Sequence, residues 1–598
     1  MAEQQKRRLQ VLQKHLSSGR KHQPRPTATE PVTLHSEGQV CMVETGARLK
    51  QGTKFQEQIK KRGISAEVQP PPQGLEQAHS TLLTPEAVAF VARLCAEFDR
   101  DVDQMLRARV LRKIQMDQSG ELPDFNEKTR RICESEWKVH SVPRRLQNRH
   151  VDLGDVSPAN TQHFLQALKS KAEGIQTDFD DGHCPTWTTQ LKGLYNVYLA
   201  VHNKLPGAPR ISNAPVLMLR PRAWNMVEHN MLVNGKEVPG PLFDFGLLMF
   251  HNAHLLIDRD SGPFFYLSKL EGATEARLWN KVFIWTQDKL DIRIGTVKAC
   301  VLIENILASF EMHEILYELR EHSLGLNCGM WDYSASFVNK FGHRPDFVLP
   351  DRSKYVSMER HFLKSYMDLV IQTCHRRGAH ATGGMSALLL PGEGQAGGKD
   401  VVDRVCRAKL SEIKSGADGF MVYDVGLIRP MHLLYDKFAP GANQLHVKRA
   451  DVHVESKDLL QMPTGGVTLN GLKHNIAVGI QFINAWLNGQ GHFFYKGCVE
   501  DSATAEISRS QVWQWVRHGA RLEVWQWVRH SARLEDSGET ITRGMVEGLV
   551  QQALRDLHPT GMDAAAAIFL EIVLKRDFPE FITTYLNLEH TFLSGKSS

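Results

Sequence analysis

The sequence has no CxxC pair and no apolar run long enough to cross a membrane, and each absence excludes a class of protein. Nine cysteines are scattered among 598 residues at wide, irregular intervals. This pattern indicates reduced thiols and argues against a structural zinc site. The most apolar stretches, Ala299–Leu307 and Ala564–Leu574, are short and carry Glu304 and Glu571. We therefore expect a reducing compartment and no membrane insertion.

Signatures of nucleic-acid and phosphate binding are also missing. The net charge is only +5, and lysine and arginine are spread along the chain, so we expect no nucleic-acid partner. The paired glycines of residues 378–385 (GAHATGGM) match neither a dinucleotide fingerprint nor a P-loop, and they resemble a substrate-facing loop. The first residues are too charged for a secretory signal peptide. The composition, 42% hydrophobic and 23% charged, is that of a globular protein.

Periodicity changes along the chain and predicts regions of different structure. Thr84-Pro85-Glu86 is a helix start, with a capping threonine and a proline at the first helical position. Between about 170 and 435, short apolar runs alternate with helical stretches. This alternation fits either a parallel α/β barrel or a doubly wound sheet. After about 450 the pattern is helical again.

A tandem duplication interrupts the last helical region. Residues 512–523 (VWQWVRHGARLE) are followed at once by residues 524–535 (VWQWVRHSARLE), which differ only at Gly519 and Ser531. Twelve residues are not a whole number of helical turns, so the second copy would turn its apolar face away. We interpret the repeat as a recent duplication or a gene-model error, and its tryptophans as packing residues rather than a ligand cage.

Charged residues follow several of the expected strands. Glu304, Asp332 and Arg220 each come directly after, or a few residues after, a short apolar run. In a parallel barrel the carboxyl ends of the strands form the catalytic face. Two carboxylates there can bind Mg²⁺, and an arginine can hold a carboxylate bidentately. Each residue alone could also be a helix cap, a loop acceptor or a solvated charge, and spacing by itself favours those simpler roles.

Asp501 allows two interpretations of the same kind. It lies between a short apolar piece and a helical stretch. A carboxylate that is partly desolvated there could act as a general base. Acidic residues are also common in the first turn of a helix, and local pattern favours this simpler explanation.

Taken together, these segments resemble the malate synthase family. Residues 320–333 (REHSLGLNCGMWDY) fit the family signature basic–polar–His–x–x–Gly–Leu–Asn–x–Gly–x–Trp–Asp–Tyr. Further blocks of the family are LPDF at 122–125, LFDFGLLMFHN at 242–252, LPDR at 349–352, CHRRGAHATGGM at 374–385 and EDSATAEISR at 500–509. The resemblance extends from about residue 82 to about residue 590, which is nearly the whole folded chain.

The resemblance implies a (β/α)₈ TIM barrel between two helical regions. The expected segments are a targeting segment at 1–19, a flexible linker at 20–80, an N-terminal helical clasp at 81–165, the barrel at 166–440 and an all-helical C-terminal domain at 441–598. It also implies the activity, condensation of acetyl-CoA with glyoxylate to give malate and CoA in the glyoxylate cycle. An oligomer is compatible with this assignment.

The resemblance further implies roles for particular residues. By motif, Glu304 and Asp332 are similar to the family's Mg²⁺ ligands, and Asp501 to the base that deprotonates acetyl-CoA. Arg220 is similar to the arginine that contacts glyoxylate and the developing enolate. The glyoxylate-binding loop would be Gly329, Met330, Trp331 and Asp332.

The chain also departs from the family pattern. The family block DFEDS is Asp178-Phe179-Asp180-Asp181-Gly182 here, and Ser334-Ala335 replaces an aliphatic–Phe pair. No predicted ligand, arginine or base is lost, but several departures lie near the expected site. Two alternatives therefore stand beside the main expectation: a catalytically decayed relative kept for binding, and a related condensation with another 2-oxo acid such as pyruvate.

The first residues resemble a peroxisomal targeting signal. Arg8-Leu9, five residues and then His15-Leu16 fit the pattern basic–aliphatic–five–His/Gln–Leu/Ala. On a helix, Leu9 and Leu16 lie on one face, which an import receptor could bind. The alternative is a basic amphipathic helix that touches a membrane surface. We expect import into the peroxisomal matrix.

Overall fold

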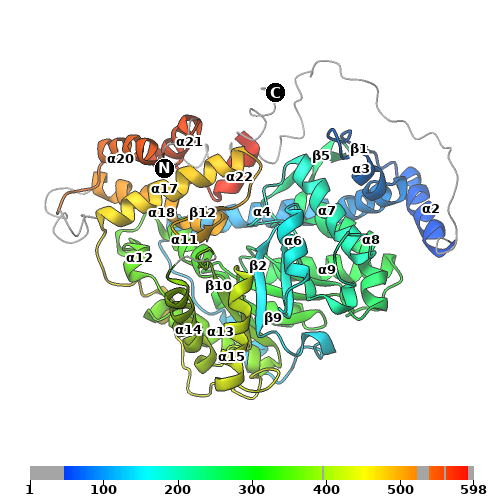
Figure 1. Ribbon diagram of the computed structural model, residues 1–598, viewed down its shortest axis with the longest axis horizontal. Helices are drawn as coiled ribbons and strands as arrows, with labels where there is room; N and C mark the ends of the chain where they lie inside the picture. Colours follow the sequence, from blue (N-terminus) through cyan, green and yellow to red (C-terminus); the bar gives the residue numbers. More distant parts are fainter. Residues whose placement is uncertain (1–45, 393–395, 522–537, 558–560, 590–598) are drawn as a thin grey trace.

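A closed barrel of eight parallel strands forms the centre of the protein in the computed structural model, which describes residues 46–392, 396–521, 538–557 and 561–589 (Figure 1). The strands follow one another around the barrel in the order β10-β11-β2-β3-β4-β7-β8-β9. Their bounds are β2 Val151–Val156, β3 Gly174–Asp178, β4 Val216–Arg220, β7 Phe264–Leu267, β8 Lys298–Ile303, β9 Ser323–Cys328, β10 His380–Ser386 and β11 Gly419–Val422. The predicted TIM barrel is confirmed, and the doubly wound sheet is wrong.

The strands that the sequence pattern predicts are those whose buried residues are mostly apolar. Strands β4 and β8 (VLMLR and KACVLI) are buried along their whole length, and such strands appear as apolar runs. Strands β2, β3 and β10 carry polar residues into the barrel interior, so no apolar run marks them. Two expectations are therefore corrected. The barrel begins at Val151 rather than at 166, and most of residues 378–385 is strand β10 rather than a loop.

Helices alternate with the strands and surround the barrel. They are α6 Thr161–Leu168, α7 Trp187–Val201, α8 Gly240–Asp258, α9 Ala273–Lys289, α10 Met312–Glu318, α11 Met330–Phe341, α13 His361–Arg377, α14 Gly398–Ser415 and α15 Ile428–Phe438. A small antiparallel sheet of β1 (Ala66–Val68), β5 (Val227–Val233) and β6 (Lys236–Pro239) joins residues before the barrel to the connection between β4 and α8.

The N-terminal clasp is dominated by one long helix, α4 (Pro85–Ser119). Thr84 caps it by accepting a hydrogen bond from the Ala87 N–H, and Gly120 ends it in the left-handed conformation. Val91 and Leu94 of α4 pack so closely on Gly246 of α8 that any side chain there would touch both. The clasp is therefore fixed directly to the barrel wall.

The segment predicted as a flexible linker is partly structured. Residues 46–80 contain helix α2 (Gly46–Lys61), strand β1 and the start of helix α3 (Glu76–Leu82). Phe55 of α2 is 2% exposed and makes an edge contact with Phe90 of α4. The apolar contact explains why this helix packs on the clasp. The predicted targeting residues Arg8, Leu9, His15 and Leu16 lie outside the described residues.

Helices of the C-terminal region gather on one side of the barrel, drawn in yellow to red in Figure 1. They are α17 Leu469–Leu487, α18 Ser502–Arg521, α20 Arg543–Leu557, α21 Asp563–Leu574 and α22 Ile582–Glu589, with a hairpin of β12 (Phe493–Tyr495) and β13 (Cys498–Glu500) before α18. Trp513 and Trp515 are buried, and their indole N–H groups donate to the backbone carbonyls of Lys575 and Leu349. The tryptophans of the first repeat copy therefore pack as expected, whereas the second copy lies outside the described residues. Within the described parts, no helix is both long and apolar enough for a membrane span.

Candidate active site

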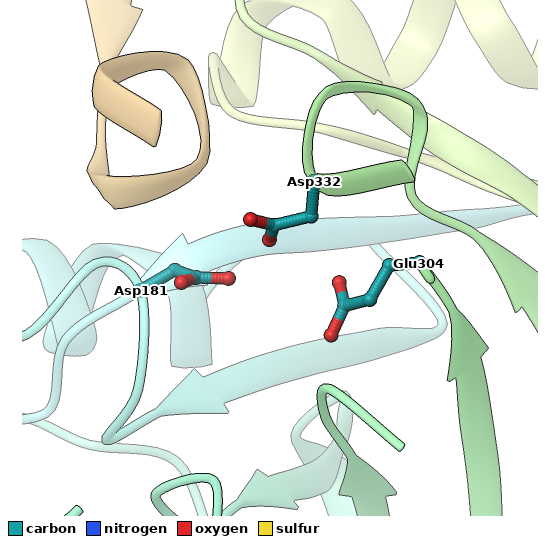
Figure 2. A group of neighbouring side chains, drawn as sticks. All are labelled: Asp181, Glu304 and Asp332. Atoms are coloured by element: carbon teal, nitrogen blue, oxygen red, sulfur yellow. The ribbon is translucent and has the colours of Figure 1, made fainter. Parts of the chain in front are cut away.

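Three buried carboxylates meet at the carboxyl end of the barrel. Asp181 follows β3, Glu304 directly follows β8, and Asp332 lies in the first turn of α11, just after β9. One oxygen from each lies within 4.8 Å of the others, and Figure 2 shows the three side chains pointing toward one another. The structure therefore brings together Glu304 and Asp332, the two predicted metal ligands. Asp332 belongs to a helix rather than to the loop that we expected.

Two buried cations surround this acid triad. The Arg220 guanidinium, at the end of β4, donates to Ser268 Oγ at 2.7 Å, to Asp178 Oδ2 at 3.1 Å, and to Asp180 and Asp181. The Lys269 ammonium lies 2.8 Å from Asp180 Oδ2, 2.6 Å from Asp181 Oδ1 and 3.7 Å from Asp332 Oδ2. Arg220 is thus a buried member of the acidic site and not a solvated surface arginine.

Burial and the two cations act in opposite directions on the acids. Burial raises the pKa of Glu304 to about 7, even though Lys269 and Arg220 attract its charged form. Burial likewise raises the pKa of Asp332 well above its usual value. For Asp181, burial is outweighed by Arg220 and Lys269, which hold its pKa below the usual value. Negative charge at Glu304 and Asp332 is therefore only partly compensated by the protein's own cations.

This donor set fits a hard divalent cation. Mg²⁺ prefers carboxylate and other oxygen ligands and usually takes only one or two protein carboxylates besides water and substrate oxygens. The triad offers oxygens from Asp181, Glu304 and Asp332 at mutual distances suited to one shared ion. Burial raises the pKa of Glu304 and of Asp332, so a bound cation would stabilise their charged forms.

The start of α11 lies against the same acids. A Cβ atom at Gly329 would come within 2.8 Å of the Glu304 Cβ, so only glycine fits there. The Gly329 N–H donates to the Tyr366 hydroxyl at 3.0 Å. The following residues, Met330, Trp331 and Asp332, form the first helical turn, where backbone N–H groups point outward and favour anions. The geometry of the predicted glyoxylate loop thus suits a small carboxylate.

Asp501 reaches the site from the C-terminal region. It is buried at the start of α18, and its Oδ1 accepts a hydrogen bond from the Thr504 N–H at 3.0 Å. The next residue, Ser502, donates to Asp181 of the acid triad. Burial, and then the negative charge of Asp501, raise the pKa of neighbouring Asp155 well above its usual value. Asp501 is therefore both a helix cap and a carboxylate beside the triad.

A cavity borders the triad between the barrel and the C-terminal helices. Lys269, Glu304 and Asp332 line it from the barrel, and Glu506 and Phe581 line it from the C-terminal region. A reaction at the triad would thus take place between two parts of the chain, which can exclude bulk water.

Sequence reasoning missed Lys269, Asp180 and Asp181 as site residues. A signal for the acids was present, because Asp178, Asp180 and Asp181 follow one another closely just after a strand. Lys269 similarly comes two residues after the end of β7. A charged residue at the end of a barrel strand is therefore a candidate site residue even when the strand before it is too polar to be predicted.

Comparisons with known proteins agree with this architecture. Family models described as the TIM-barrel, C-terminal and N-terminal domains of malate synthase match residues 216–462, residues 466–523 and 520–589, and residues 73–131. The chain is 41% identical to malate synthase of Myxococcus xanthus over 514 residues, covering 84% of this chain and 93% of that protein. It is 37% identical to malate synthase of Dictyostelium discoideum over 524 residues (84% and 94%). It is 40% identical to glyoxysomal malate synthase of Brassica napus over 460 residues (75% and 81%).

Proposed function

This chain belongs to the malate synthase family of glyoxylate-cycle acyltransferases, and we propose that it joins acetyl-CoA to glyoxylate at the acid triad and releases malate and CoA. The observation that carries the proposal is the convergence of Glu304 and Asp332 from the barrel with Asp501 from the C-terminal region. Metal ligands and a base from different domains make an interdomain condensation site.

Asp501 takes the role of the base. Its carboxylate removes a proton from the acetyl methyl group, and the electron pair moves onto the thioester oxygen to form an enolate. Arg220 supplies a fixed positive charge for that oxygen, held in place by Ser268 and Asp178. The enolate carbon then forms a bond to the aldehyde carbon of glyoxylate, while the aldehyde π-bond electrons move onto the aldehyde oxygen, which takes up a proton and becomes the hydroxyl of malyl-CoA. Water cleaves the thioester carbon–sulfur bond of the resulting malyl-CoA, which releases malate and the CoA thiol.

Glu304, Asp332 and Asp181 would hold Mg²⁺ at the triad. When bound, Mg²⁺ supplies Lewis-acid chemistry that orients glyoxylate and polarises its aldehyde. In the first turn of α11, the backbone N–H groups of Met330, Trp331 and Asp332 would face the substrate carboxylate. Lys269 keeps Asp181 and Asp332 close together, since its ammonium contacts Asp181 and approaches Asp332.

A thiol-release assay tests the proposed reaction. The purified chain is incubated with acetyl-CoA, glyoxylate and Mg²⁺, and free CoA is measured with a thiol reagent. We expect release that needs all three components and stops when a chelator removes the metal. If a folded chain released no CoA, this would support the alternative that the protein is a catalytically decayed relative kept for binding. Faster release of CoA with pyruvate than with glyoxylate would support the alternative that the enzyme condenses acetyl-CoA with another 2-oxo acid.

We also propose that the protein is imported into the peroxisomal matrix. The support is the targeting pattern at Arg8, Leu9, His15 and Leu16, together with similarity to a relative named as glyoxysomal. An import receptor would be the partner. The test fuses residues 1–40 to a fluorescent protein, with and without Leu9→Arg. Punctate peroxisomal signal that the substitution abolishes supports import, and diffuse signal from the unmutated fusion contradicts it.

A further inference from the structure

Lys269 lies where three parts of the chain meet, in the connection between β7 and α9. Its backbone adopts a left-handed conformation, with φ +54°, which residues other than glycine take up only when their surroundings hold them there. Its N–H donates to Glu304 Oε1 at 2.7 Å, and its ammonium contacts Asp180 and Asp181. One residue thus orients acids from two different strand ends.

The third contact comes from the N-terminal clasp. Arg109 of α4 donates from Nη2 to the Lys269 carbonyl at 2.8 Å. The same guanidinium forms a two-point ion pair with Glu275 in the first turn of α9, at 2.8 and 2.6 Å. Glu275 in turn accepts the N–H of Glu271 at 3.1 Å. Arg109 therefore clamps both ends of the 269–275 connection.

Because the Arg109 contacts are buried, neither water nor a lysine can replace them. Arg109 and Glu275 are both 5% exposed, so water cannot replace their contacts when one partner is lost. The planar fork of an arginine reaches the carboxylate and the carbonyl at the same time, which a lysine ammonium cannot do with the same geometry. The left-handed peptide of Lys269 is thus held by Glu304 on one side and by Arg109 on the other.

We propose that Arg109 is a positioning residue for the metal site: the N-terminal clasp sets Mg²⁺ affinity by holding Lys269, and through it Glu304 and Asp181, in the arrangement that binds the ion. The inference rests on the proposed function, because it takes the acid triad as the Mg²⁺ site. It assigns the clasp a part in the chemistry beyond covering the barrel. Contacts behind metal ligands commonly change affinity by about 10- to 100-fold.

A second ion pair of the same helix, more exposed than the first, provides a control for attachment of the clasp. Lys236 of β6 contacts Asp99 and Asp103 of α4 at 2.6 and 2.8 Å, on the clasp but away from the 269–275 connection. Loss of this pair weakens the attachment of the clasp without touching Lys269. A purely structural clasp would leave the Mg²⁺ affinity of the folded variants unchanged at both places.

The experiment measures Mg²⁺ binding to the full chain by isothermal titration calorimetry, without substrates. The variants are Arg109→Lys, the double variant Arg109→Leu with Glu275→Leu, and Lys236→Leu. The double variant removes both charges, so that no buried carboxylate is left unpaired. Arg109→Lys keeps the charge, so we expect it to fold even if the double variant does not. Circular dichroism and thermal melting establish that each chain is folded.

We expect the dissociation constant for Mg²⁺ to rise at least about tenfold in the double variant, and by less in Arg109→Lys. Lys236→Leu should keep wild-type affinity while its melting temperature falls. Wild-type affinity in the folded Arg109 variants would overturn the inference, and so would an equal loss in Lys236→Leu. A wild-type chain that binds no Mg²⁺ would instead overturn the proposed metal site, and the inference with it.

Discussion

Replacing Arg220 by lysine keeps a positive charge at the acid triad but removes the planar fork. The Arg220 guanidinium donates to Ser268 at 2.7 Å, to Asp178 at 3.1 Å and to Asp181. A lysine ammonium is a compact charge at the end of a flexible stem, so it can follow one of these directions but not all of them. The substitution therefore tests geometry rather than charge.

The size of the effect follows from the contacts that are lost. A hydrogen bond to a charged group contributes about 1.5–3 kcal/mol, so losing one or two of them displaces the cation substantially. Removing one preorganised donor from an oxyanion site lowers turnover about 100- to 1000-fold, equivalent to about 2.7–4 kcal/mol. We expect kcat/KM of Arg220→Lys to fall by that factor. Burial already raises the pKa of Asp178 to about 6, against the attraction of Arg220, and weaker pairing should raise it further.

Arg222→Lys is the matched control for this experiment. Arg222 is equally buried and binds Asp244 at 2.7 Å and Glu228 at 2.9 Å through the same kind of fork. Both variants should melt at lower temperature, but only Arg220→Lys should lose most of its thiol release. Near wild-type turnover in Arg220→Lys would refute the role of Arg220. An equal loss of turnover in both variants would show that the fork serves folding alone.

Three further predictions concern the base, the metal site and its pH dependence. Asp501→Asn should stop solvent deuterium exchange into the acetyl methyl group while Mg²⁺ binding persists, and exchange at the wild-type rate would exclude Asp501 as the base. Gly329→Ala should weaken Mg²⁺ binding, measured by calorimetry, because the new Cβ would come within 2.8 Å of the Glu304 Cβ; unchanged affinity would contradict the close approach. Because burial raises the pKa of Glu304 to about 7, a proton must leave before the ion binds at lower pH. Mg²⁺ affinity should therefore fall as the pH drops below that value, by about tenfold per pH unit for each proton that the ion displaces, and a flat calorimetric profile between about pH 6 and 8 would contradict this.

Local pattern was sufficient for much of the barrel. Strands β4, β7 and β8 are buried on both faces, so their residues form short apolar runs that the sequence displays directly. Glu304 and Arg220 could be placed at the catalytic edge because each follows such a run. Their specific roles came from the family resemblance, since spacing alone favoured simpler explanations for both.

The polar strands and the long-range contacts could be identified only from the tertiary structure. Strands β2, β3 and β10 direct polar side chains into the barrel, so their sequences resemble loops until neighbouring strands provide hydrogen-bonding partners. For the same reason the sequence shows the acids of residues 178–181 as a departure from the family pattern but does not indicate that Asp181 joins the triad.

The clearest contrast lies between the acids and the residues that hold them. A carboxylate after a strand can be recognised from a few neighbouring positions, because the chain itself carries it to the barrel rim. The contact between Arg109 and Lys269 joins positions 160 residues apart, and nothing local to either one indicates the other. The sequence thus specified which chemical groups stand at the barrel rim, but only packing of the clasp and the C-terminal helices against the barrel decided which charges meet there, because burial and distance set their interaction.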